Sequence, residues 1–378
     1  MTNAYLYTGD PSFKEWVIEY VGGWMDRIEQ NGGIIPDNVG PTGKIGEHRE
    51  GQWWGGLYGW NYYMGYNVIF HGVSIAAECT KLLTGDDSYV DMLRSQIKVV
   101  VDQGARRKED GQMIVPSRYT ADGWADDTAG PPKPMRMLEP AHLYHMSMSK
   151  EDYQLIDHIR EGDVIRSWTE VPTQGEKNDG ATETARFSYY DGKLPDWPEK
   201  ALSADFELAL RDLESLRNEH RDPETLIREN ASIPSGVYAK ALTQVTMGAP
   251  QGVYCGGLLR ATVRYFDDDR QRAGLPPDVA ALVDELKADR VGVQFFNTST
   301  SESRNLIVQA GAFGEHEFTS VRYREDESLT EVPVNAKYVA VALPPSTSIR
   351  LDMGMKRFAN DPSYAFPWHG DRIPVPFV

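Results

Sequence analysis

A short motif that occurs twice constrains the fold of this chain more than any other feature of its sequence. Thr-Gly-Asp-x-Ser followed by Phe or Tyr stands at residues 8–13 and again at 84–89. Each copy leads into a segment with helical spacing, 11–28 and 87–101, followed by a glycine-containing stop. Repeats of this kind are typical of supersecondary units that stack on one another. We therefore expect helical hairpins, each with one buried and one surface helix, and a fainter third copy near Ser149.

Other helix signals occur throughout the first 250 residues. Asp10 and Pro11 suit the N-cap and the first helical position, and apolar side chains follow them at helical spacing. Residues 61–83 are apolar on nearly every side, which predicts a helix buried all round. Two further amphipathic segments, 201–216 and 237–247, continue the series.

Beyond Ala249 the pattern changes to the alternation of half-buried strands. The expected strands are 259–266, 291–297, 303–309, 318–323, 337–343 and 348–352. Short strands separated by turn residues fit an antiparallel sandwich. The sequence thus predicts a helical domain over 1–250, an antiparallel β-sandwich over 251–360 and an extended tail rich in aromatic residues and proline over 361–378.

The charge of the chain disfavours several partners. Its 39 basic and 56 acidic side chains give a net charge of −17, and no basic cluster is interleaved with aromatic residues. Nucleic-acid binding needs a basic surplus on one face, so nucleic acid is not an expected partner. No stretch approaches the ~18 continuous apolar residues of a membrane span. The first residues lack a secretory signal, so the chain as it stands is expected to be cytoplasmic.

Known cofactor motifs do not occur in the sequence. It contains no phosphate-binding loop, dinucleotide glycine fingerprint or serine-hydrolase elbow, and no cofactor is expected. Cys79 and Cys255 make no disulfide framework or metal motif and are expected to be separate buried thiols. The triplet at 315–317 is expected to be a solvated turn. The oligomeric state is not readable from the sequence.

The combination of repeated hairpins, an aromatic loop at 51–61 and the C-terminal strands at 334–358 resembles the (α/α) toroid enzymes that act on carbohydrates. These include uronate-cleaving polysaccharide lyases and inverting glycosidases. The resemblance implies an (α/α) toroid followed by a β-sandwich, with an oligo- or polysaccharide bound at the toroid mouth. Fewer hairpins can be counted here than such toroids usually have. We therefore expect the chain to be N-terminally incomplete, and a longer protein would be secreted or periplasmic.

The loop between Asp37 and Asn61 is the strongest candidate for the substrate-binding site. Aromatic faces stack on the apolar faces of sugar rings, while neighbouring polar groups hold the hydroxyls. The candidate substrate-binding residues of this loop are His48, Trp53, Trp54, Tyr58, Trp60 and Asn61. The alternative is that these aromatic residues belong to the core, which is their commonest position.

A second loop, 116–127, follows the second repeat helix as the first loop follows the first. Equivalent positions in stacked hairpins lie on one rim, so both loops are expected to face one cavity. Arg118 suits pairing with a substrate carboxylate, Asp127 a general base and Trp124 stacking on a sugar. The alternative is a solvated acidic turn.

A third segment, 136–145, places Glu139, His142 and His145 three residues apart. Imidazole titrates near neutrality, which suits proton transfer, although structural histidines are an equal possibility. The spacing is not that of known zinc motifs, which disfavours zinc binding, and no metal site is predicted. Arg136 is a further candidate for substrate binding.

Three functions remain open from the sequence, with a lyase acting on a uronic-acid-containing glycan slightly ahead. A lyase needs a neutralising group, for which Arg118, His48 or Asn61 are candidates, and a proton-transfer group. The candidates for proton transfer are Tyr119, Tyr144, His142 and His145. An inverting or unsaturated-uronyl hydrolase needs two carboxylates across a sugar instead. The candidates for these are Asp126, Asp127, Asp37 and Glu47. The third possibility is a glycan-binding protein without catalytic activity.

Overall fold

The structure is a computed structural model that describes residues 1–56, 59–60, 65–126, 134–135, 138–163, 181–231, 237–247, 258–325 and 328–369. Its internal contacts divide the chain into two compact units. The first unit joins residues 1–163 to residues 260–378, and the second consists of residues 164–259. Helices and a C-terminal β region of antiparallel strands are both present, which confirms the expected mixture of a helical part and a β part.

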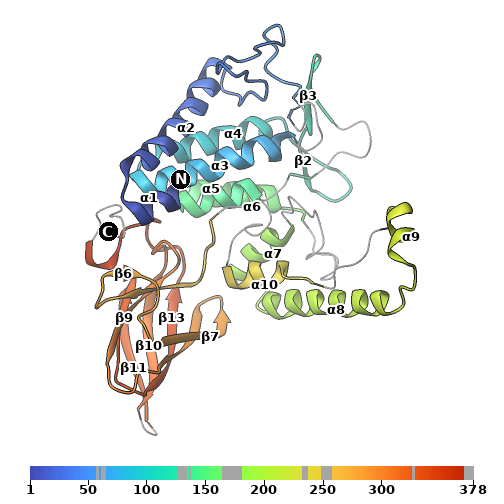
Figure 1. Cartoon of the computed structure of the whole chain (residues 1–378). Helices are drawn as coiled ribbons and strands as arrows, with labels where there is room; N and C mark the ends of the chain where they lie inside the picture. The colour runs from blue at the N-terminus through green and yellow to red at the C-terminus, as the bar shows by residue number, and fades with distance from the viewer. Residues whose placement is uncertain are drawn as a thin grey trace. The chain divides into compact units, whose positions relative to one another are not determined.

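The helices of the first unit form three consecutive hairpins (Figure 1). The pairs are α1 (Thr2–Thr8) with α2 (Pro11–Gln30), α3 (Gly65–Thr84) with α4 (Ser88–Val101), and α5 (Leu138–Ser147) with α6 (Lys150–Arg160). Helix α3 packs against α2, α4 and α5, so it lies at the centre of this group. Its side chains from Val73 onward that face the neighbouring helices, such as Ala77 and Leu82, are fully buried. No described helix is both long and apolar enough to cross a membrane.

The repeated motif forms the same turn in the first two hairpins. The hydroxyls of Thr8 and Thr84 each accept a hydrogen bond of 3.2 Å from the backbone N–H of the motif aspartate. That aspartate, Asp10 or Asp86, in turn accepts a 2.9 Å bond from the backbone N–H of the motif serine. The motif glycine has a positive φ of 71° or 74°, a conformation that glycine adopts without strain. The motif therefore specifies the joint between the two helices of a hairpin.

The third hairpin keeps this joint with different residues. Met148, with φ 47°, takes the place of the motif glycine, and the Ser147 hydroxyl accepts a 3.2 Å bond from the Ser149 N–H. The side chain of Ser149 then caps α6 by accepting a bond from Asp152. The faint third copy in the sequence therefore forms the same type of joint as the first two, with other side chains.

Two short antiparallel hairpins follow α4. Strand β1 (Ala105–Arg106) pairs with β2 (Met113–Ile114), and β3 (Arg118–Thr120) pairs with β4 (Gly123–Ala125). In the second hairpin Tyr119 lies opposite Trp124.

The β region contains two antiparallel sheets. The first has the order β11 (Ser328–Ala336), β10 (Glu317–Glu325), β13 (Ser348–Lys356), β8 (Arg290–Asn297) and β7 (Val279–Lys287). The second has the order β12 (Tyr338–Leu343), β9 (Arg304–Ala310), β5 (Val263–Asp267) and β6 (Arg272–Ala273). Both sheets contribute to one buried apolar cluster, in which Tyr265 of β5 meets Phe295 of β8 edge to face. Burial of this cluster holds the two sheets together.

The sequence did not predict β7 and β11, which are the two edge strands of the larger sheet. Both expose apolar side chains, including Leu282 and Leu329, so their alternation is not the usual apolar-in, polar-out pattern. Pro333 lies within β11, a residue that strands tolerate only at an edge or a bulge. Pairing with the inner strands, rather than a local signal, therefore determines these two strands.

The described part of the expected C-terminal tail packs on the β region. Phe366 contacts the ring of Phe266, and Tyr364 contacts that of Phe313. Trp368, in a 3-10 turn over Pro367–His369, stacks on Phe366.

The second unit contains α7 (Ala181–Tyr190), α8 (Trp197–Arg217), α9 (Pro223–Arg228) and α10 (Lys240–Met247). Helix α8 packs against α7 and α10. The buried carboxylate of Asp205 accepts a 2.7 Å bond from the backbone N–H of Ala241, which joins α8 to the start of α10.

A bidentate ion pair between α4 and α6 yields a first prediction. Both oxygens of Asp152 accept 2.8 Å hydrogen bonds from Arg94, and the carboxylate is 2% exposed. Burial raises the pKa of Asp152, but the Arg94 guanidinium outweighs it and the pKa is lowered. The pair therefore stabilises the fold above the ordinary carboxyl pKa, and this contribution is lost as the pH falls through the lowered value.

We expect Asp152→Asn to lower the free energy of unfolding at pH 7 by about 2 kcal/mol, since it removes charge-assisted hydrogen bonds to a buried group. Urea denaturation measures this change. The matched control is Asp102→Asn directly after α4, whose pair with Lys98 is exposed on both sides and contributes little. Equal effects of the two substitutions would contradict the prediction.

Candidate functional site

Five aromatic side chains from two distant loops meet in the first unit. The ring of Tyr119 lies 4.6 Å from that of Trp53, 5.9 Å from that of Trp54 and 5.1 Å from that of Trp124. The ring of Trp60 lies 5.3 Å from that of Trp124. We call these five residues the aromatic cluster. Its contacts bring together the loop before α3 and the β3–β4 hairpin after α4.

The loop before α3 is held by the carboxylate of Asp37. Its two oxygens accept hydrogen bonds from the backbone N–H groups of Gly55 at 3.1 Å, Gly56 at 3.2 Å and Trp60 at 2.5 Å. Burial raises the pKa of Asp37, and the three amide donors only partly oppose this shift. A Cβ on Gly59 would collide with the same carboxylate, so the close approach requires glycine there.

The cluster has a buried base and a partly open rim. Trp60 is 1% exposed and donates its ring N–H to the carbonyl of Ile35 at 2.7 Å. The backbone N–H of Tyr119 donates to the carbonyl of Trp60 at 2.7 Å, which ties the hairpin to the loop. The other four rings are half-buried. A ligand that stacks on aromatic faces would find Trp53, Trp54, Tyr119 and Trp124 at this rim.

The remaining predicted binding residues lie elsewhere or outside the described residues. His48 is exposed, has a positive φ of 64° and lies 3.9 Å from Glu47. Tyr58, Asn61, Asp127 and Arg136 lie outside the residues that the structure describes.

Arg118 belongs to the same short strand as Tyr119. Successive side chains of a strand point to opposite faces, so Arg118 leaves the hairpin on the face away from the aromatic cluster. Its Nε donates to the backbone carbonyl of Asp126 at 3.0 Å. Arg118 and Tyr119 therefore do not converge on one point.

His142 belongs to a buried polar group. Its Nδ1 lies 2.7 Å from Oε1 of Glu78 on α3, and the guanidinium of Arg260 lies 3.5 Å from the same oxygen. His142 is 1% exposed, and Glu78 is fully buried. A carboxylate in the core requires such partners because burial of an isolated charge is very costly. These contacts connect two helices to the segment that enters the β region.

The two other candidates on α5 contact one residue of the β region. The imidazole of His145, also 1% exposed, stacks on Phe358 with ring centroids 5.6 Å apart. The ring of Tyr144 meets those of Phe358 and Tyr153 edge to face. The described surroundings of Tyr144 and His145 are thus aromatic packing between α5, α6 and the end of β13.

The expectation of a solvated turn at 315–317 is wrong for two of its three residues. Glu315 and His316 are 2% and 4% exposed. Glu315 accepts a 2.8 Å bond from the Phe313 N–H, and His316 accepts a 3.0 Å bond from the Phe358 N–H. Burial raises the pKa of Glu315, whereas burial and the nearby Arg357 hold the pKa of His316 well below its ordinary value. The turn is covered by residues that follow β13, which no local pattern in the triplet reveals.

Two of the carboxylates considered for hydrolysis are engaged in local structure. Asp37 accepts three backbone hydrogen bonds, as described above. Glu47 accepts bonds from the backbone N–H and hydroxyl of Thr42, which lower its pKa. Among the described residues, no group of three His, Cys, Asp or Glu side chains is arranged to hold a metal ion.

No sequence motif singled out Glu78 or Arg260 as a candidate. A signal for Glu78 was present, because it is a charged residue within a segment predicted to be buried on all sides. Such a residue needs a buried partner. Arg260 has no comparable signal, since arginine on an alternating strand is ordinarily exposed.

A family model described as a domain of unknown function, DUF8034, matches residues 1–243. The chain belongs to the DUF8034 family. The matched region contains the three helical hairpins and all five residues of the aromatic cluster, and it ends within α10 before the β region. Comparison with curated proteins and with solved structures found no match. The aromatic cluster is therefore part of what the DUF8034 model covers, whereas Arg260 and the sheets lie beyond it.

The role of Asp37 gives a second prediction. Asp37→Ala removes the acceptor for three backbone donors, so we expect the near-ultraviolet circular dichroism of the tryptophans to weaken and stability to fall by at least about 2 kcal/mol. Asp26→Ala, an exposed aspartate on α2, is the control and should change neither. An unchanged tryptophan spectrum in Asp37→Ala would show that the loop does not depend on this carboxylate.

His316 gives a third prediction, on pH. The folded protein keeps His316 neutral, while the unfolded chain binds a proton below its ordinary pKa of 6.5, so stability falls as the pH drops below that value. We expect His316→Gln to lose less stability than the wild type between pH 7.5 and pH 5.5, measured by urea denaturation. The raised pKa of Glu315 changes stability with pH in the opposite direction, and Glu315 is present in both proteins. The difference between the two pH profiles therefore isolates His316. Parallel pH profiles would contradict the prediction.

Proposed function

We propose that this DUF8034 protein is a carbohydrate-active enzyme of the (α/α) toroid type that cleaves a uronic-acid-containing glycan by β-elimination. The observation that carries the proposal is the aromatic cluster, in which half-buried rings from two loops surround the phenol of Tyr119. Sugars are recognised by stacking on such rings, and ligand sites combine apolar walls with a few polar groups.

The arrangement of the helices supports the toroid part of the proposal. Three hairpins share one type of joint, and the aromatic residues follow the second helix of the first two hairpins. In a toroid of this kind, loops in equivalent positions would lie on the same rim. The contact between Tyr119 and both Trp53 and Trp54 is what that arrangement requires.

The elimination would use Tyr119 for proton transfer. The base takes the proton from C5 beside the carboxylate, the C4–O4 bond breaks, and the departing oxygen takes up a proton, which leaves a C4–C5 double bond. Among the described residues, the phenol oxygen of Tyr119 has no hydrogen-bond partner, so it is available to a substrate. Tyr119 is preferred to His142 and His145 because both imidazoles are buried.

The geometry of Asp37 and Glu47 disfavours these two carboxylates for hydrolysis, whereas Asp127 lies outside the described residues. An inverting hydrolase needs one carboxylate as acid and another as base, with a sugar between them. Asp37 and Glu47 are instead bonded to backbone amides of their own loop. Arg118, on the face of its strand opposite Tyr119, is not assigned as the group that neutralises the substrate carboxylate.

A panel of uronate polymers tests the proposal through the ultraviolet absorbance of the unsaturated product. We expect turnover of at least one polymer, and a decrease in kcat of at least about 100-fold in Tyr119→Phe, the scale of lost proton transfer. Trp53→Ala should raise KM by removing a stacking face.

The matched control is Tyr20→Phe, an exposed tyrosine on α2 that stacks on Trp16. It should leave turnover unchanged. Absence of product from every polymer, or full activity of Tyr119→Phe, would overturn the assignment. Binding without turnover would identify a glycan-binding protein instead.

A further inference from the structure

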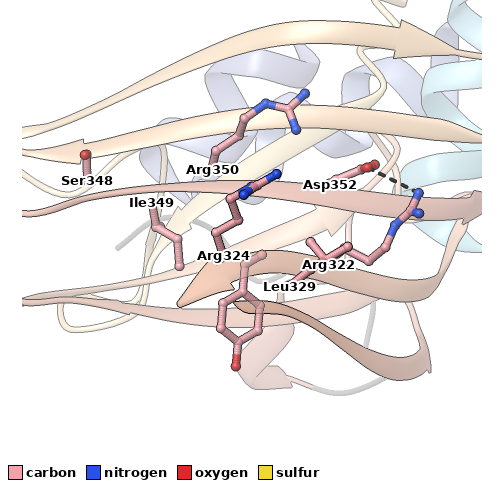
Figure 2. Close-up of a pocket in the computed structure, with 8 residues that line it drawn as sticks. Arg322, Arg324, Leu329, Ser348, Ile349, Arg350 and Asp352 are labelled. Atoms are coloured by element: carbon pink, nitrogen blue, oxygen red, sulfur yellow. Dashed lines mark ion pairs between the residues drawn. The ribbon is translucent and has the colours of Figure 1, made fainter. Parts of the chain in front are cut away.

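A pocket lies on the outer face of the larger sheet of the β region (Figure 2). Its volume is about 340 Å³, and strands β10, β11 and β13 supply its lining. Figure 2 shows Arg322 and Arg324 on β10, with Arg350 on the neighbouring strand β13. Three guanidinium groups therefore gather on one face of a chain whose net charge is −17.

The three arginines differ in how their charge is balanced. Arg322 lies 3.2 Å from a carboxylate oxygen of Asp352. Arg350 donates to both oxygens of Asp284, at 2.9 and 3.0 Å. Arg324 is exposed and has no ion-pair or hydrogen-bond partner among the described residues. Among the described residues, one positive charge in the pocket is thus left without a counter-charge.

The strand register places Arg322 beside its counter-charge, because Arg322 is paired with Asp352 across β10 and β13. Arg350 extends instead to Asp284 and Glu285 of β7. An anion beside Arg324 would supply the counter-charge that no described side chain gives and would accept hydrogen bonds from its guanidinium.

The rest of the lining favours an anion attached to a larger body. Leu329, 64% exposed, offers an apolar surface beside Arg324, and Ser348 offers a hydroxyl. A volume of about 340 Å³ lies within the range of small-molecule sites and exceeds what a bare ion fills. A sugar ring that carries a carboxylate combines the three features that the pocket can contact.

We propose that this pocket is a second binding site for a carboxylate-bearing saccharide, with Arg324 as its principal anion-binding residue. The choice of a saccharide rests on the proposed function, while the choice of an anion rests on the arginines alone. The site would hold a distant part of a uronate chain and take no part in bond cleavage.

Titration calorimetry tests this inference in the full chain that carries Trp53→Ala, so that binding at the aromatic cluster is weakened. The probe is an oligogalacturonate, compared with its methyl-esterified form and with inorganic sulfate. We expect Arg324→Gln to weaken oligogalacturonate binding about tenfold, the effect of losing one charge-assisted contact. The methyl-esterified form should not respond to Arg324→Gln.

The matched control is Lys356→Gln, which removes an equal charge from the neighbouring strand β13 outside the pocket and should change affinity by less than about twofold. Equal affinities of Arg324→Gln and its parent, or binding of sulfate but not of the oligosaccharide, would overturn the inference. Arg324-dependent binding without turnover would refute only the enzymatic proposal. Turnover without any effect of Arg324 would refute only the second site.

Discussion

The carboxylate of Asp37 is the constraint on which the arrangement of the aromatic cluster depends. A glycine-rich loop loses much conformational entropy when it becomes ordered, and it cannot form its own regular hydrogen bonds. One half-buried carboxylate satisfies three of its backbone donors and thereby determines where Trp60 lies. Trp60 then supports Trp124 through its ring and Tyr119 through its backbone carbonyl. The open rim of Trp53, Trp54, Tyr119 and Trp124 follows from that support.

A second buried set of charges joins the helices to the β region. Glu78 lies on the central helix α3, and its carboxylate is shared between His142 of α5 and Arg260, which precedes β5. Removing one partner of a buried pair leaves an uncompensated charge, so the three residues depend on one another. This connection links the DUF8034 part of the chain to the sheets that carry the arginine pocket. It also explains why His142, a candidate for proton transfer, is enclosed in the core.

Local patterns in the sequence predicted much of the fold. The repeated Thr-Gly-Asp motif predicted the hairpins because its hydrogen bonds lie within a few residues of one another. The inner strands were predicted because one of their faces is buried. Strands β7 and β11 were not predicted because exposed apolar side chains such as Leu282 and Leu329 hide the alternation, so their conformation depends on pairing with a neighbour.

The candidate site was only partly predictable for the same reason. The repeat allowed the two aromatic loops to be placed together, which the ring contacts of Tyr119 bear out. It gave no information on which polar side chains are buried. Arg260 and His316 are covered by segments far away in the sequence, and the opposite directions of Arg118 and Tyr119 depend on a three-residue strand that was not expected.

We propose that the aromatic cluster is a sugar-binding surface. A crystal structure of the Tyr119→Phe variant soaked with an acidic oligosaccharide tests this proposal. We expect a sugar ring stacked on Trp53, Trp54 or Trp124, with its C5 facing the position of the missing phenol oxygen. An oligosaccharide bound only elsewhere on the protein, with the cluster free of ligand, would contradict it.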